Sequence, residues 1–191
     1  MVVERITKKP CYEEIERRIL APLELFGIVP QDSRDIPGLV PGYLGLENPF
    51  HAPDKTLDAD ERFFLNPQFE WAGGGFADNG GALARWAKAL YEGPLLEPET
   101  RAKMVAGKDA SRELGPGMRY GLACEIGSTS HGEAWGHAGF FPGYLTEMRY
   151  WPEHRIAVAV QVNTSEYAAL PHPLGALCEE LLGVALEPDG G

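Results

Sequence analysis

The chain has 191 residues, of which 44% are hydrophobic, and its formal net charge at pH 7 is -11. A chain of this length and composition can bury a hydrophobic core, which excludes a disordered tail. Its 17 lysines and arginines are dispersed along the sequence, and this argues against binding to nucleic acid or to an anionic membrane.

The cysteine spacing and the lengths of the apolar runs exclude further classes of protein. Cys11, Cys124 and Cys178 lie far apart with no CxxC spacing, so neither a zinc knuckle nor a dense disulfide framework is predicted. The sequence has no apolar run of about 18 residues, and its start, MVVERITKKP, carries charges where a signal peptide needs an apolar stretch. The native localisation stays unknown from these features.

The first half of the chain is predicted to hold helices around a long irregular segment. Residues 12–20 have helical apolar spacing, and residues 2–7 read as the tail of an earlier helix. Residues 26–72 contain too many prolines for long regular elements, and loops of this length are usually functional or belong to a larger architecture. A helix is then expected after Asp78 or Asn79, ending at Gly93, followed by a short helix at 99–105.

The second half changes to an extended pattern. Strands are predicted over residues 118–126, 133–139, 144–151 and 155–163, and short links between them imply an antiparallel sheet. The closing helix carries a broad apolar stripe that needs the sheet as its packing surface: Leu174, Leu177, Cys178, Leu181 and Leu182. The expected fold class is α/β of the α+β type, an antiparallel sheet flanked by helices.

The histidines give no metal-binding pattern. His131 and His137 are six positions apart with Glu133 between them, which does not match the HExxH spacing. His51 and His172 lie in proline-containing loops and His154 in a hairpin turn, where side chains are usually solvated. We therefore predict no metal site.

The usual nucleophile patterns are also missing from the sequence. There is no G-x-S-x-G motif, and Ser128 and Ser130 lie in a polar link with no base placed beside them. Cys124 has apolar neighbours and is predicted to be a core thiol. The glycine cluster at residues 73–75 lacks the Lys-Ser or Lys-Thr ending of a phosphate loop, so it is interpreted as a tight turn.

The stretch WGHAGFFPGY, residues 135–144, is the most informative segment. His137, Ala138 and Gly139 at a strand edge would place an imidazole in a cleft, keep that cleft open and let a substrate backbone approach. The N–H of Phe140 could then donate a hydrogen bond to a developing oxyanion. A plain strand-ending turn explains the same residues equally well, and the local pattern leaves both interpretations open.

The order of five segments adds a family resemblance. ERITKKPCYEEIERRILAPLELFGI, WAGGGFADNGGALARWAKALYEG, MRYGLACEI, WGHAGFFPGY and RIAVAVQVN follow one another. This succession resembles the C-terminal part of the serine β-lactamase and penicillin-binding-protein superfamily, and most closely its class C-like branch of DD-peptidases, esterases and β-lactamase-related proteins.

The resemblance implies roles for four consecutive residues. His-Ala-Gly is similar to the family's third active-site motif, written KTG, HTG or HGG elsewhere. His137 would orient the substrate carboxylate or ester, Ala138 and Gly139 would line the substrate site, and the Phe140 N–H would belong to the oxyanion hole. Alanine in place of threonine or glycine favours an ester or amide substrate over a penicillin.

The sequence departs from the family in its nucleophile. No serine is followed three positions later by lysine, and no Tyr-x-Asn or Ser-x-Asn is present. The nearest similar spacing, Thr100 to Lys103, lies where the family has no nucleophile. Both motifs precede the ERITKK segment in family order. We therefore expect residues 1–191 to be a single partial domain, β-lactamase/transpeptidase-like and incomplete at its N-terminus.

Two functional hypotheses follow. The first is a β-lactamase-related serine hydrolase that uses no metal or organic cofactor, with this chain a fragment that is inactive alone. Its partners would be a small-molecule or peptide substrate and either a second copy or a complementing N-terminal fragment. The alternative is a non-catalytic module of the same fold that binds a peptide, a cell-wall fragment or a partner chain. The sequence leaves open whether this chain is an enzyme.

Overall fold

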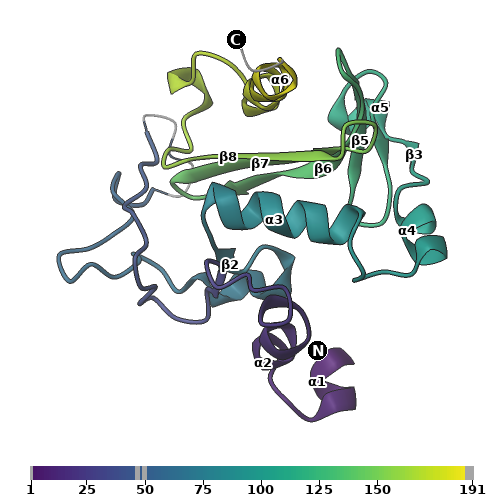
Figure 1. Ribbon diagram of the computed structural model, residues 1–191. Coiled ribbons are helices and arrows are strands. Elements are labelled where there is room, and N and C mark those ends of the chain that lie inside the picture. The colour runs from purple at the N-terminus through teal and green to yellow at the C-terminus, as the bar shows by residue number, and fades with distance from the viewer. Residues whose placement is uncertain (1, 46–47, 49–50, 188–191) are drawn as a thin grey trace.

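A six-stranded antiparallel sheet forms the centre of the computed structural model, which describes residues 2–45, 48 and 51–187 (Figure 1). Its strands follow one another in chain order, each paired with the next. They are β3 (Lys108–Asp109), β4 (Arg119–Tyr120), β5 (Glu125–Thr129), β6 (Gly132–Phe141), β7 (Tyr144–Trp151) and β8 (Ile156–Val162). The predicted antiparallel sheet is confirmed.

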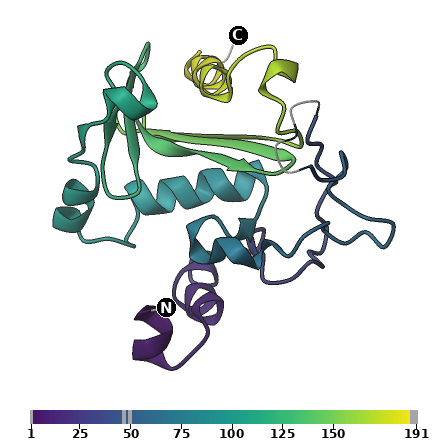
Figure 2. The same cartoon turned by 180° about the vertical axis from the view of Figure 1, so that it is seen from behind.

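Two helices cover the opposite faces of this sheet. Figures 1 and 2 show α3 (Gly80–Tyr91) on one face and α6 (Leu174–Leu186) on the other. The helix α3 begins where the Asn79 side chain accepts a hydrogen bond of 3.0 Å from the Ala82 N–H. That contact satisfies one of the amides that a helix start leaves unpaired, so Asn79, one of the two predicted caps, sets the first turn of α3.

The remaining helices lie around this three-layer centre. Three N-terminal helical elements lie beyond α3 (Figure 1): α1 (Val2–Thr7), α2 (Cys11–Ile15) and the π-helical η1 (Glu16–Leu20). Beside them is a small sheet of two strands, β1 (Val29–Pro30) and β2 (Phe76–Ala77). The elements α4 (Pro98–Met104) and α5 (Ser111–Leu114) lie near β3. Two 3-10 helices, η2 (Pro67–Gly73) and η3 (Tyr167–Ala169), interrupt the loops.

The core lies on both faces of the sheet. Tyr91 of α3 packs with Met148 and Tyr150 of β7 on one face, and Trp151 packs with Cys178 and Leu182 of α6 on the other. The prediction that the apolar stripe of α6 packs on the sheet is therefore confirmed for Cys178 and Leu182. It is wrong for Leu181, which is 49% exposed because it points away from the face that meets the sheet.

The strand predicted over residues 118–126 is interrupted. Its two ends form β4 and β5, and between them Ala123 adopts a positive φ of 51°. A Cβ at Gly121 would overlap the backbone of Met104, and the Leu122 N–H donates to the Met104 carbonyl at 3.0 Å. The close approach of the segment after α4 therefore breaks the strand.

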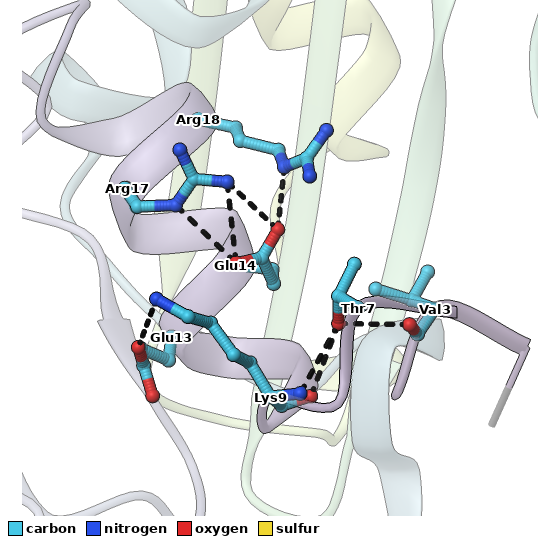
Figure 3. A network of polar contacts seen from close by, with 7 residues as sticks. All are labelled: Val3, Thr7, Lys9, Glu13, Glu14, Arg17 and Arg18. Atoms are coloured by element: carbon cyan, nitrogen blue, oxygen red, sulfur yellow. Dashed lines mark hydrogen bonds and ion pairs between the residues drawn. The ribbon is translucent and has the colours of Figure 1, made fainter. Parts of the chain in front are cut away.

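Ion pairs fix the N-terminal helices beyond α3. Figure 3 shows Arg17 and Arg18 both reaching the Glu14 carboxylate, while Lys9 pairs with Glu13. The hydrogen bond from Arg17 lowers the pKa of Glu14, and Arg18 acts in the same direction. This network orders the helix that carries Tyr12, whose hydroxyl donates to the Trp71 carbonyl at 3.1 Å.

None of the helices in the described ranges has the length and apolarity that crossing a bilayer requires.

Candidate active-site strand

The strand β6 extends beyond its neighbour β5. Pairing with β5 stops at Glu125 opposite Gly136, whereas pairing with β7 continues to Phe141 opposite Tyr144. Residues 137–140 are exposed, and within the described residues their ladder partner is β7 alone. The predicted site residues thus lie together along one open stretch of strand edge.

The hairpin at the end of β6 decides which backbone groups face that open side. Phe141 and Tyr144 flank a two-residue turn, and residues that flank such turns bond to each other through their own N–H and C=O groups. Because these groups alternate along a strand, those of Ala138 and Phe140 are directed away from β7. The Phe140 N–H therefore points away from β7.

Two positions of β6 are occupied by glycine for different structural reasons. A Cβ at Gly136 would overlap the Met148 carbonyl oxygen on β7, whereas one at Gly139 would meet only Thr146, with the Thr146 Cβ 3.4 Å away. Gly136 is thus required by strand packing. Gly139 leaves a gap on the exposed edge beside His137, and the fold itself has room for a methyl group there.

Hydrogen bonds on both ring nitrogens fix the imidazole of His137. Its Nδ1 lies 2.5 Å from the Ala138 carbonyl oxygen, and its Nε2 lies 2.9 Å from the Tyr120 hydroxyl. A carbonyl oxygen only accepts, so Nδ1 must be the protonated nitrogen of the neutral ring. The Nε2 atom then accepts the Tyr120 O–H.

Charged side chains lie behind this imidazole. Glu125 Oε1 is 3.6 Å from His137 Nδ1, and Glu125 Oε2 is 3.0 Å from Arg149 Nη2. Arg149 also pairs with Glu147 on the same strand. Burial raises the pKa of Glu147, while the neighbouring Arg149 acts in the opposite direction. Arg149 thus forms ion pairs with two largely buried carboxylates, and one of these, Glu125, faces the His137 imidazole.

The other histidines lie away from this edge. His131 is in the turn at the start of β6, with its ring 6.4 Å from that of His154, and His154 Nε2 is 3.0 Å from the His131 carbonyl oxygen. His154 thus lies in the hairpin turn, as predicted, but it is half-buried and hydrogen-bonded rather than fully solvated. His51 and His172 are exposed, as predicted.

The candidate nucleophiles lie apart from the His137 edge as well. Ser128 lies within β5 rather than in a link, and the Ser130 hydroxyl donates to Glu179 at 2.9 Å. Cys124 is a buried thiol, as predicted, and burial raises its pKa. Across the described part of the chain, no three His, Cys, Asp or Glu side chains are grouped so that they could hold a metal ion.

Sequence reasoning missed Tyr120, Glu125 and Arg149. These residues meet His137 through the pairing of β4, β5, β6 and β7, and no local motif marks them. The only available signal was their position on neighbouring predicted strands, which does not fix the register.

A family comparison decides the identity of this fold. The model of the Beta-lactamase family matches residues 1–175. The chain belongs to the beta-lactamase family. The resemblance inferred from the order of the five segments is therefore confirmed. Comparison with curated proteins found no match.

Solved structures of the beta-lactamase fold agree with this assignment. A D-stereospecific amidohydrolase from Streptomyces sp. is 26% identical, with a TM-score of 0.69 over 85% of this chain and 46% of that chain. A D-amino acid amidase from Ochrobactrum anthropi SV3 is 18% identical, with a TM-score of 0.74 over 98% and 56%. A penicillin binding protein from Bacillus halodurans is 17% identical, with a TM-score of 0.66 over 94% and 52%. This beta-lactamase-family chain spans about half the length of each.

Proposed function

We propose that this chain supplies one wall of the active site of a serine hydrolase that cleaves an amide next to a D-configured residue. The observation that carries the proposal is the open edge of β6, which combines a fixed His137 imidazole with the outward direction of the Phe140 N–H. The amide class is supported by the 26% identity with the Streptomyces amidohydrolase.

The proposed chemistry divides between this wall and a nucleophile. A serine hydroxyl attacks the amide carbonyl while a lysine amine three positions along its helix takes the proton. The Phe140 N–H stabilises the oxyanion, the C–N bond breaks, and the amine leaves with a proton. Water then hydrolyses the acyl ester and releases the acid. In this proposal His137 and Tyr120 bind the polar group of the substrate beside the scissile bond.

The nucleophile has to come from a segment outside these 191 residues, since the sequence contains no Ser-x-x-Lys. A complementing segment of this kind is the partner we propose. On its own the chain should not be acylated. We expect a fluorophosphonate probe or a fluorescent penicillin to leave every serine of the purified chain unlabelled, as measured by intact-protein mass spectrometry.

The decisive experiment reads the frame upstream of Met1 and expresses any longer product that it encodes. If that frame encodes Ser-x-x-Lys followed by Tyr-x-Asn, the longer product should release ammonia from D-amino acid amides. His137→Ala in the longer product should lower kcat/KM by about 100-fold or more. A stop codon upstream, or a longer product that never forms an acyl-enzyme, would favour the second candidate, a binding module, which the missing nucleophile also supports.

A further inference from the structure

Beside the His137 edge, three phenylalanine rings form a continuous aromatic cluster. The Phe69 ring stacks on the Phe141 ring with centroids 5.9 Å apart and planes 17° apart. The Phe141 ring contacts that of Phe63 at 5.5 Å, and Phe63 is only 1% exposed. The cluster therefore runs from the buried core to the surface, where Phe69 remains 59% exposed.

The cluster lies at the end of β6 that follows His137, whose ring turns along the open edge toward Tyr120 and Glu125. Side chains alternate along a strand, so His137, Gly139 and Phe141 share one face, and Gly139 leaves a gap between the two larger side chains. This arrangement puts a polar group, a gap and an aromatic face in sequence along about 13 Å of strand. A ligand seated there meets hydrogen-bonding groups at one end and aromatic rings at the other.

The 3-10 helix η2, which carries Phe69, is held in place at both of its ends. The Asn66 side chain accepts from the Gln68 N–H at 3.0 Å, and the Tyr12 hydroxyl donates to the Trp71 carbonyl at 3.1 Å. Trp71 adopts a φ of 46°, and Gly75 packs so close to the Trp71 carbonyl that a Cβ would overlap it. A strained backbone that its surroundings keep in place is common beside functional sites. The exposure of Phe69 is thus built into the fold.

We infer that Phe69 and Phe141 form a subsite for an aromatic side chain on the residue whose carbonyl is cleaved. An aromatic group packed against Phe69 would remove apolar surface from water and gain the geometry of a stacked pair. The inference rests on the proposed function for the position of the scissile carbonyl, and it adds the substrate class.

Binding of two amides to the full 191-residue chain tests this inference, with affinities taken from chemical-shift changes in NMR titrations. We expect D-phenylalanine amide to bind about five- to tenfold more tightly than D-alanine amide. Phe69→Ala should abolish that preference and leave the affinity for D-alanine amide unchanged. Phe69→Leu keeps an apolar side chain and should retain part of it.

The matched control is Phe26→Ala, because Phe26 is equally large and 74% exposed. It should keep the full preference for D-phenylalanine amide. Equal affinities for the two amides, an equal effect of Phe26→Ala and Phe69→Ala, or no millimolar binding of D-phenylalanine amide would each overturn the subsite. Because binding requires no nucleophile, a preference found here without hydrolysis by the longer product would sink only the proposed function.

Discussion

The Tyr120 hydroxyl lies 2.9 Å from His137 Nε2, and the two rings meet edge to face with centroids 5.7 Å apart. The residues belong to β4 and β6, which are separated in the sheet by β5. They meet because the β5 ladder ends at Glu125, the residue that pairs with Tyr120 on one side and Gly136 on the other. The short β5 thus lets a tyrosine hold the imidazole on the open edge.

Replacing Tyr120 by phenylalanine should change the tautomer of His137. In the native chain the Ala138 carbonyl accepts from Nδ1, and the Tyr120 hydroxyl donates to Nε2. Loss of one such hydrogen bond costs about 0.5–1.5 kcal/mol, so the Nε2-protonated form should rise about two- to tenfold relative to the Nδ1-protonated form. The ¹⁵N resonances of the imidazole report this ratio. Tyr167→Phe, at an exposed tyrosine, is the control. An unchanged tautomer ratio in Tyr120→Phe would show that the Tyr120 hydroxyl does not fix the His137 tautomer.

The two glycines of β6 predict opposite responses to alanine. Gly136→Ala places a methyl group against the Met148 carbonyl, so β6 and β7 must separate and the free energy of unfolding should fall by about 3 kcal/mol or more. Gly139→Ala should change stability by less than about 1 kcal/mol, because its Cβ finds ordinary contact with Thr146. Chemical denaturation measures both variants. Equal destabilisation would show that Gly139 is also a packing requirement.

Local chemistry explains which parts of the fold were predictable. Asn79 satisfies one of the first amides of α3 with its own side chain, and the apolar run at residues 156–160 of β8 needs cover on both faces. Both signals lie within a few residues of the element that they specify. The break at residues 121–124 was missed, because its cause is a contact with Met104, which is distant in sequence.

Of the candidate site, only the residues on β6 could be predicted from the sequence. His137 to Phe140 are consecutive, so one motif named them all. Glu125 and Arg149 reach the same place through sheet register, and Phe69 reaches it through a 3-10 helix that Tyr12 holds. Relationships of this kind depend on the folding of distant segments onto each other, which a single sequence does not encode in any local pattern.

Removing the arginine shared by two carboxylates should destabilise the chain strongly. Arg149→Met leaves Glu125 and Glu147, both largely buried, without their common cation, and we expect a loss of about 3–5 kcal/mol at neutral pH. The loss should shrink in acid, as protonation removes the buried charges. Arg119→Met breaks the more exposed pair with Glu133 and should cost at most about 1 kcal/mol. Similar losses in the two variants, measured by denaturation, would contradict this account.

Asp78 should make stability depend on pH in a direction opposite to that of most carboxylates. Burial raises the pKa of Asp78 from 3.8 to about 6, although the hydrogen bond from Gln161 acts against this. Between these two values the folded chain binds a proton that the unfolded chain has released, so this group's contribution to stability falls as pH rises through that window and stays low above it.

Asp78→Asn keeps an oxygen for Gln161 and removes the buried charge. At neutral pH the variant should therefore gain about 1–3 kcal/mol in the free energy of unfolding, and at about pH 4 the gain should vanish. Denaturation at a series of pH values measures the difference, with Asp60→Asn, at an exposed carboxylate, as the matched control. A variant that is less stable than the native chain at neutral pH would mean that the Asp78 charge is stabilised by its surroundings rather than penalised by burial.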